Sequence, residues 1–283
     1  MTARRFLSKI IPAAVKTRIR NFIIPPRPSV PPVPKTLEQE ELEMLWKKNR
    51  YEPCEVTLFG TKIRILDSES YIFQKNEILG GEIYKFNSNL ESPFIIDCGA
   101  NIGLSTIYFK RIFPQAKVIA FEPDKRVFDV LHNNLQQFGF NDVELVPKGV
   151  WSSETVLTFF SEGSDAGRIA QGESAENEIQ INTTLLSSYL DREVDLLKLD
   201  IEGAEFEVLR ECSSHLHNVK NIFVEFHSFS GREQLLSEIL AILKKAGFRV
   251  NISSPGLHSA HPFIKRTEYL GMDMQLNIFG YRL

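Results

Sequence analysis

The stretch Pro93-Phe94-Ile95-Ile96-Asp97-Cys98-Gly99-Ala100-Asn101-Ile102-Gly103 joins an apolar run to an acid and a glycine-spaced loop. A helical pattern begins near Leu104, and a second apolar run over 117–121 ends on Glu122. Strand, loop, helix, strand and acid, in this order, are the layout of a nucleotide-binding βαβ unit. A unit of this kind holds its ligand at the carboxyl ends of its strands.

Apolar runs and helical patterns alternate through the rest of the 283-residue chain. The sequence predicts strands over 94–97, 117–121, 143–147, 194–199, 221–226 and 247–252, and helices over 104–112, 124–138, 204–211 and 232–246. Because helices separate the strands, we expect a parallel sheet covered on both faces, with an antiparallel closing strand over 274–281. Residues 161–178 are rich in Gly, Ser, Glu and Asp, which predicts a loop or mobile lid.

Composition divides the chain into three parts. Residues 1–35 carry basic side chains without any acid and end in a proline-rich linker. Residues 36–90 are expected to form a helix and a hairpin around Gly60, as a cap before the main domain. The main domain spans residues 91–283.

The basic segment and the cysteines bear on partners and location. Residues 1–24 mix bases with apolar side chains at helical spacing, which favours either an anionic membrane surface or packing on the chain's own domain. No apolar run is long enough to predict a membrane-spanning helix. Three widely spaced cysteines indicate a reducing compartment, so we expect the cytoplasm, with peripheral membrane contact as an addition. The acidic main domain argues against a nucleic-acid partner.

The loop after the first strand of the main domain departs from the dinucleotide pattern GxGxxG. Gly99 removes a side chain where backbone passes close to a ligand, and Asn101 tolerates a positive φ. Gly103 lets the helix begin close to the strand. The carboxylate of Asp97 would repel a diphosphate and suits a cationic amino group or ribose hydroxyls better.

Two further acids extend this site. Glu122 ends the next strand, where a carboxylate is expected to accept hydrogen bonds from two ribose hydroxyls, although it could instead cap the helix near Asp124. Asp142, before the third strand, could accept the exocyclic amine of an adenine, or it could be a turn residue. Acids at strand ends without a phosphate loop point to S-adenosylmethionine, an adenosine that carries a sulfonium and no phosphate.

Asp200, Glu225 and His227 form a second group of candidates, at the ends of the fourth and fifth strands. His227 could be a general base that takes a proton from an acceptor hydroxyl. Asp200, Glu225 and His227 could instead hold a divalent metal that lowers the pKa of that hydroxyl. In the third interpretation the acids cap helices and His227 has no chemical role.

Three segments resemble the FkbM family of S-adenosylmethionine-dependent methyltransferases. They are Ile96-Asp97-Cys98-Gly99-Ala100-Asn101-Ile102-Gly103, then Phe121-Glu122-Pro123, and then Leu197-Lys198-Leu199-Asp200-Ile201-Glu202-Gly203-Ala204-Glu205. The resemblance covers about residues 70–250. It implies a class I methyltransferase, with a Rossmann-like, seven-stranded, mostly parallel α/β sheet whose seventh strand is antiparallel.

The resemblance also implies roles for single residues. Asp97, Gly99 and Gly103 would hold the methionine end of the cofactor, Glu122 its ribose, and Asp200 would lie near the transferred methyl group. We therefore expect O-methylation of a sugar, glycan, glycolipid or natural-product hydroxyl, with His227 or Asp200 accepting the proton. The alternatives are an NAD-dependent oxidoreductase or epimerase and a non-catalytic scaffold with the same fold.

Overall fold

A computed structural model of the chain describes residues 37–161, 167–169, 178–256, 259, 261–269 and 271–283. The predicted basic segment over 1–24 and the proline linker lie outside these residues, as do 162–166 and 170–177 of the predicted lid. Residues 41–283 form one compact unit. Among the described helices, none has both the length and the apolar character that crossing a membrane requires.

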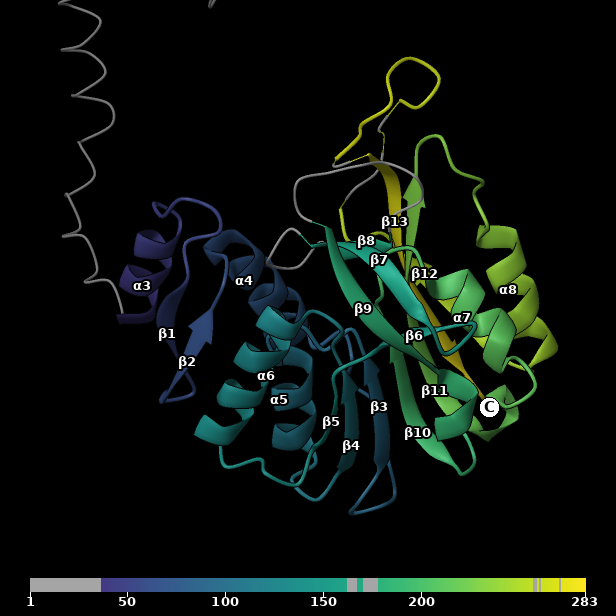
Figure 1. Cartoon of the computed structure of the whole chain (residues 1–283), viewed down its shortest axis with the longest axis horizontal. Helices are drawn as coiled ribbons and strands as arrows, with labels where there is room; N and C mark the ends of the chain where they lie inside the picture. Colours follow the sequence, from purple (N-terminus) through teal and green to yellow (C-terminus); the bar gives the residue numbers. More distant parts are fainter. Residues whose placement is uncertain (1–36, 162–166, 170–177, 257–258, 260, 270) are drawn as a thin grey trace, which may run out of the picture. The chain divides into compact units, whose positions relative to one another are not determined.

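A seven-stranded sheet forms the centre of this unit (Figure 1). Its strands, in spatial order, are β12 (Arg249–Ser253), β13 (Met272–Tyr281), β11 (Val219–Phe229), β10 (Val194–Leu199), β3 (Phe94–Cys98), β4 (Lys117–Phe121) and β5 (Glu144–Val146). Strand β13 is antiparallel to both of its neighbours, and the other pairs in this sheet are parallel. The predicted mostly parallel α/β sheet with an antiparallel closing strand is therefore confirmed.

Helices cover both faces of the sheet, as the alternating sequence predicts (Figure 1). Helices α5 (Leu104–Ile112) and α6 (Lys125–Gln137) contribute to one apolar cluster, together with Ile95 and Val118 of the sheet. Helices α7 (Glu205–Cys212) and α8 (Leu236–Lys245) contribute to a second cluster on the other face. The strands β3 and β10 are therefore buried between two apolar layers, which is why they read as continuous apolar runs.

The segment before the sheet packs into the first of these clusters. It consists of α3 (Leu37–Leu45), the hairpin β1 (Cys54–Leu58) and β2 (Thr61–Ile65), α4 (Ser68–Gln74) and the π-helical turn η2 (Lys75–Gly80). Val56, Ile63 and Tyr71 are buried there, each with at most 2% of its surface exposed. The predicted helix and hairpin are confirmed, while α4 and η2 were not predicted.

A second, smaller sheet replaces part of the predicted lid. Its strands, in spatial order, are β6 (Gly149–Trp151), β9 (Glu178–Leu185), β7 (Val156–Ser161) and β8 (Gly167–Ile169). The prediction of a continuous loop over 161–178 was wrong at both ends and at 167–169, because 161 and 178 belong to strands and 167–169 forms another. Three short 3₁₀ or π turns complete the described elements, among them η3 (Leu186–Tyr189) and η4 (Leu216–Asn218).

Candidate active site

A cavity of about 670 Å³ lies at the carboxyl edge of the large sheet. Its wall includes the loop after β3, the end of β4 and the loop between β10 and α7. From β3 the chain first crosses to β4 on one side and only later returns to β10 on the other. This reversal of strand order is where open α/β sheets bind ligands. The cap segment completes the wall, through residues such as Glu77 and Tyr84.

The loop after β3 is held tightly against its neighbours. The amides of Gly99 and Ala100 both donate to the carbonyl of Phe121, at 3.1 and 2.9 Å. Gly99 has φ +80°, and a Cβ there would lie 1.8 Å from the carbonyl oxygen of Asp200. The close approach that requires glycine in this structure is to the loop after β10, and Gly99 also lines the cavity. Asn101 has the predicted positive φ, of 50°.

Asp97 lies beneath this loop and outside the lining of the cavity. One oxygen of its fully buried carboxylate accepts from Ser105 and Thr106, at 2.6 and 2.7 Å, at the start of α5. The other lies 3.3 Å from Nζ of Lys198. Asp97 therefore fixes the loop and the helix start. Gly103, with φ +98°, begins that helix where a Cβ would meet Leu131 of α6 at 2.8 Å.

Glu122 stands at the end of β4 on the cavity wall, and its side chain is nearly buried. Its two carboxylate oxygens accept from the amides of Asn101 and Asp124, each at 3.0 Å. Asp124 caps α6 with its own carboxylate, so capping is not the role of Glu122. Burial raises the pKa of Glu122 to about 7, although the two amide hydrogen bonds lower it. Each oxygen keeps a lone pair for a ligand hydroxyl.

The structure does not bring Asp142 to this cavity. It precedes β5, which runs parallel to β4, so it lies at the amino edge of the sheet and not at the carboxyl edge. Its carboxylate pairs instead with Nζ of the buried Lys110, at 2.8 Å. Its position gives no support to the predicted contact with adenine.

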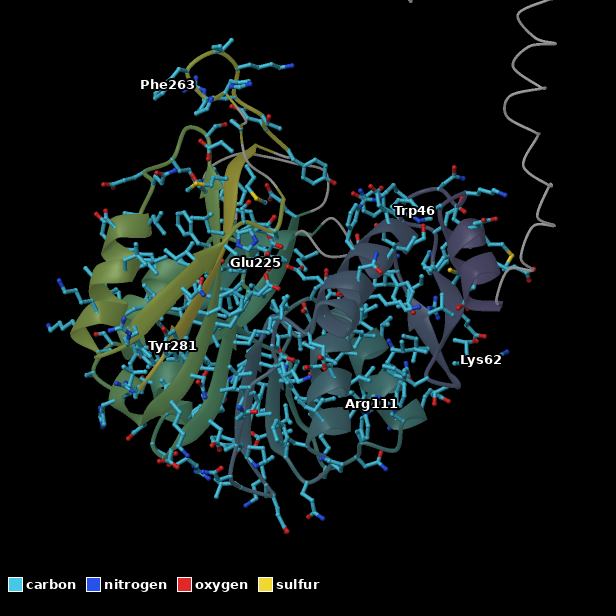
Figure 2. All side chains as sticks on the ribbon, turned by 180° about the vertical axis from the view of Figure 1, so that it is seen from behind. Trp46, Lys62, Arg111, Glu225, Phe263 and Tyr281 are labelled. Carbon is cyan, nitrogen blue, oxygen red and sulfur yellow. The ribbon has the colours of Figure 1, made fainter. Side chains whose placement is uncertain are left out.

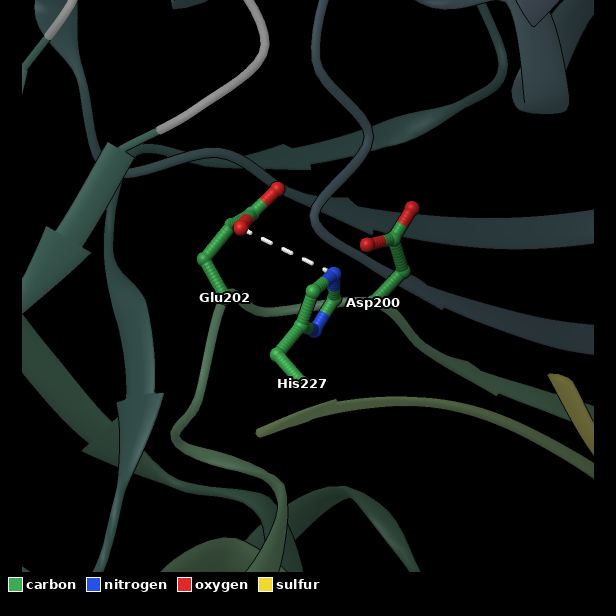
Figure 3. A group of neighbouring side chains, drawn as sticks. All are labelled: Asp200, Glu202 and His227. Carbon is green, nitrogen blue, oxygen red and sulfur yellow. Dashed lines mark ion pairs between the residues drawn. The ribbon is translucent and has the colours of Figure 1, made fainter. Parts of the chain in front are cut away.

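Asp200, Glu225 and His227 all line the cavity, as predicted, but Glu225 is not the carboxylate nearest to His227. Oε2 of Glu202 lies 3.7 Å from Nε2 of His227 (Figure 3). Oε1 of Glu205 lies 2.9 Å from Nδ1 of the same ring. Burial lowers the pKa of His227, but Glu202 and Glu205 raise it more, so the net shift is upward.

Glu225 lies in the interior of the protein (Figure 2) and accepts a short hydrogen bond from Gln275 of β13. Burial and the charge of Asp200 raise the pKa of Glu225 well above its ordinary value. Glu77 of η2 likewise accepts from Asn277, at 3.0 Å, and lines the cavity. These residues make this end of the cavity acidic and tie the cap segment to β13.

Lys198 is a site residue that the sequence reasoning missed. Its ammonium group is buried on the cavity wall, donates to the carbonyl of Gly99 at 2.8 Å and lies 3.4 Å from Oδ2 of Asp200. Burial lowers the pKa of Lys198, but the charges of Asp200 and Asp97 raise it by more than burial lowers it. The net shift is upward, so the group stays charged. The sequence did contain a signal for this role, namely a lysine inside the apolar run 194–199. A buried charge needs partners, so a lysine in a buried strand indicates acidic or carbonyl groups around it.

A family model and two curated relatives all identify this chain as similar to methyltransferases. The family model described as "Methyltransferase FkbM domain" matches residues 97–250. The chain is 31% identical over 216 residues to "Methyltransferase sdnD" of Sordaria araneosa, which spans 63% of this chain and 82% of that protein. It is 28% identical over 209 residues to "Methyltransferase 1" of Beauveria bassiana, spanning 65% and 83% respectively.

Among solved structures, the chain resembles the crystal structure of methyltransferase FkbM from Methylobacillus flagellatus KT. The identity is 16% and the TM-score 0.46, over 73% of this chain and 47% of that one. It also resembles TYW2 of M. jannaschii in complex with AdoMet, at 12% identity and a TM-score of 0.44, over 83% of this chain and 89% of that one.

Proposed function

Because this chain belongs to the methyltransferase FkbM family and has the class I methyltransferase fold, we propose that it moves the methyl group of S-adenosylmethionine to a hydroxyl oxygen. The acceptor class is a sugar, glycan, glycolipid or natural product. The reaction is an in-line displacement, in which the acceptor oxygen attacks the methyl carbon as the bond to sulfur breaks. Most of the rate then comes from positioning the two reactants.

The observation that carries this proposal is the position of Glu122. Its carboxylate is held by the amides of Asn101 and Asp124, so its free lone pairs are available at the cavity, where two ribose hydroxyls can donate to them. Asp200 and Glu202 add further negative charge to the same cavity. A sulfonium is attracted by such a wall, whereas the diphosphate of NAD is repelled. The site therefore favours the methyl donor over a dinucleotide.

The acceptor hydroxyl must lose its proton during the transfer. Asp200 and His227 lie side by side on the cavity wall and are the groups proposed to promote this loss. The acidic side chains of the lining, among them Glu77 and Glu225, offer hydrogen-bond acceptors, which suit a substrate with several hydroxyls. These features support a polyhydroxylated acceptor.

Calorimetry with the purified chain tests the cofactor. We expect binding of S-adenosylmethionine and S-adenosylhomocysteine, and no binding of NADH. Incubation with candidate sugars, glycolipids and natural products, followed by mass spectrometry, then tests the acceptor. Absence of cofactor binding would overturn the proposal. Binding without a methylated product from any panel member would favour the scaffold alternative.

The location is proposed on separate grounds. Cys54, Cys98 and Cys212 are free thiols, which fits a reducing compartment such as the cytoplasm. The basic segment over 1–24 is proposed to contact an anionic membrane surface, because it mixes bases with apolar residues at helical spacing. Liposome co-sedimentation of the full chain and of a chain lacking residues 1–35 tests this contact. Equal binding by both would contradict it.

A further inference from the structure

We propose that Asp200, Glu202 and His227 bind a divalent metal ion at the wall of the methyl-transfer cavity. The binding itself follows from the arrangement of these side chains, while its use in catalysis rests on the proposed function. Within the described part of the chain, these three residues offer ligand atoms that all lie within 4.8 Å of one another (Figure 3). Glu202 takes the place of Glu225 in the metal set that the sequence analysis left open as one of three interpretations.

The three side chains come from one strand and from the loop that follows its parallel neighbour. Asp200 follows the end of β10 directly, Glu202 lies two residues further along, and His227 is part of β11. Metal–ligand bonds of about 2.0–2.2 Å require ligand atoms somewhat closer together than 4.8 Å. The carboxylates of Asp200 and Glu202 are 25% and 20% exposed, so both have room to rotate onto an ion.

His227 is already oriented as a metal ligand. Its side chain is 1% exposed, and Nδ1 donates to Oε1 of Glu205 at 2.9 Å. The same oxygen of Glu205 also accepts from the amide of Gly203, at 2.9 Å, which holds the carboxylate in place. Because Glu205 accepts the hydrogen bond from Nδ1, Nε2 is the ring nitrogen that an ion can use, and the ion takes the place of the proton that the neighbouring carboxylates favour there. A carboxylate behind the distal ring nitrogen is the usual support of a metal-binding histidine.

Nε2 of His227 has no hydrogen-bond partner among the described residues. Oε2 of Glu202 lies 3.7 Å away, beyond hydrogen-bond range, and is itself an acceptor. Figure 3 shows one oxygen of Asp200 pointing toward the same imidazole. A buried nitrogen that faces two carboxylates across a gap requires positive charge there, and a divalent cation between them supplies more of it than the single proton of an imidazolium. This is the observation that separates the group from an ordinary acidic cluster.

The donor set indicates the kind of ion. One imidazole and two carboxylates suit first-row divalent ions such as Mn²⁺ or Zn²⁺ better than Mg²⁺ or Ca²⁺, which prefer oxygen ligands alone. Lys198 does not replace such an ion, since its ammonium group is already bonded to the carbonyl of Gly99 and shared between Asp97 and Asp200.

Three protein ligands leave coordination positions open toward the cavity. An acceptor hydroxyl that binds there has its pKa lowered by the ion. Its proton leaves to solvent, and the oxygen keeps the electron pair of the O–H bond. That oxygen then forms a bond to the methyl carbon while the C–S pair returns to sulfur, giving a methyl ether and S-adenosylhomocysteine. The ion thereby explains how an ordinary alcohol is activated.

Metal binding is tested on the full chain after removal of metals with a chelator. Electron paramagnetic resonance should show the free Mn²⁺ signal decreasing by one ion per chain. Calorimetry with Zn²⁺ should give the same stoichiometry. The variants His227→Ala and Glu202→Gln should lose this binding. Glu205→Gln removes the charge behind His227 but keeps an oxygen for the amide of Gly203, and it should weaken the binding by about 10–100-fold. Glu225→Gln, a carboxylate of the same cavity outside the group, should keep it.

Cofactor calorimetry and thermal unfolding of each variant separate the possible failures. If S-adenosylmethionine binds while neither ion does, the metal proposal is overturned and the proposed function stands. Methyl transfer that survives exhaustive chelation would overturn the catalytic use of the ion, and would leave His227 as a general base. Ion binding that is unaffected in well-folded His227→Ala and Glu202→Gln proteins would place the ion elsewhere and overturn the site.

Discussion

Glu122 is a buried carboxyl group whose ionisation opposes folding. Burial raises its pKa from 4.5 to about 7, so between these values the folded protein holds a proton that the unfolded chain has lost. The contribution of Glu122 to the free energy of unfolding therefore falls as the pH rises through this window. At 1.36 kcal/mol per pKa unit, ionised Glu122 costs up to about 3 kcal/mol above pH 7.

We therefore predict that Glu122→Gln removes this pH dependence. The free energy of unfolding of the variant, relative to wild type, should increase by up to about 3 kcal/mol between pH 5 and pH 8. A constant loss from the replaced hydrogen bond cancels in this comparison. Urea denaturation at both pH values measures it. The same substitution should weaken S-adenosylmethionine binding at pH 8, and identical pH profiles for the two proteins would contradict the assignment.

Lys198 provides a second prediction for a single residue, because it is the buried cation shared by Asp97 and Asp200. Lys198→Met keeps the volume of the side chain but leaves two carboxylates without their partner. Removing one member of a buried pair typically costs about 3–5 kcal/mol. Urea denaturation should show a loss of this size. Lys62→Met, at an exposed pair on the β hairpin (Figure 2), should change stability by less than about 0.5 kcal/mol.

The loop after β3 and the loop after β10 depend on each other for their shape. Gly99 and Gly60 have nearly the same φ, +80° and +81°, but a Cβ at Gly99 meets the Asp200 carbonyl while one at Gly60 meets nothing within 4 Å. Both alanine variants pay the left-handed strain, of about 1–2 kcal/mol. Only Gly99→Ala should lose clearly more than this and also lose cofactor binding. Equal losses by thermal denaturation would contradict the close approach.

The elements also show why some of the site was predictable from the sequence. The ranges 104–112, 117–121 and 194–199 match α5, β4 and β10 residue for residue, because buried segments are mostly apolar and their bounds stand out from the polar and turn residues around them. Parallel strands share a carboxyl edge, so Glu122, Asp200 and His227 could be placed together from strand ends alone. The direction of β5 also places Asp142 at the opposite, amino edge of the sheet, since this residue precedes the strand.

Loop backbone accounts for most of what was not predicted. Glu202 reaches His227 from a loop in which its own φ is 56°, a conformation that no periodic pattern reveals. The second sheet was missed for a related reason. Its strands β7 and β9 flank a polar segment. The polar composition of that segment led to the prediction of a loop over 161–178. The neighbouring residues 178–185, however, alternate in burial as a strand does. Apolar alternation at the ends of a polar segment is thus the more informative signal.

At the scale of the whole molecule, the β hairpin and the large sheet are joined through one buried side chain. Asn134 of α6 accepts from the amide of Arg64 at 2.8 Å, and its own amide donates to the carbonyls of Arg64 and Ile102, each at 2.9 Å. It thus connects β2 of the hairpin to the loop that forms the cavity. The apolar core likewise continues across residue 90, where the sequence predicts the end of a cap.

Asn134→Leu should therefore destabilise the whole molecule and not the hairpin alone. The substitution keeps the volume but leaves buried backbone groups without partners, at about 1–3 kcal/mol for each such group. Calorimetry should show a single transition at a lower temperature, with cofactor affinity reduced because the loop at Ile102 loses its support. Asn133→Leu, its exposed neighbour on the same helix, should leave the transition almost unchanged. Two separate transitions in the Asn134→Leu protein would instead mean that residues 36–90 unfold independently, as an autonomous cap would.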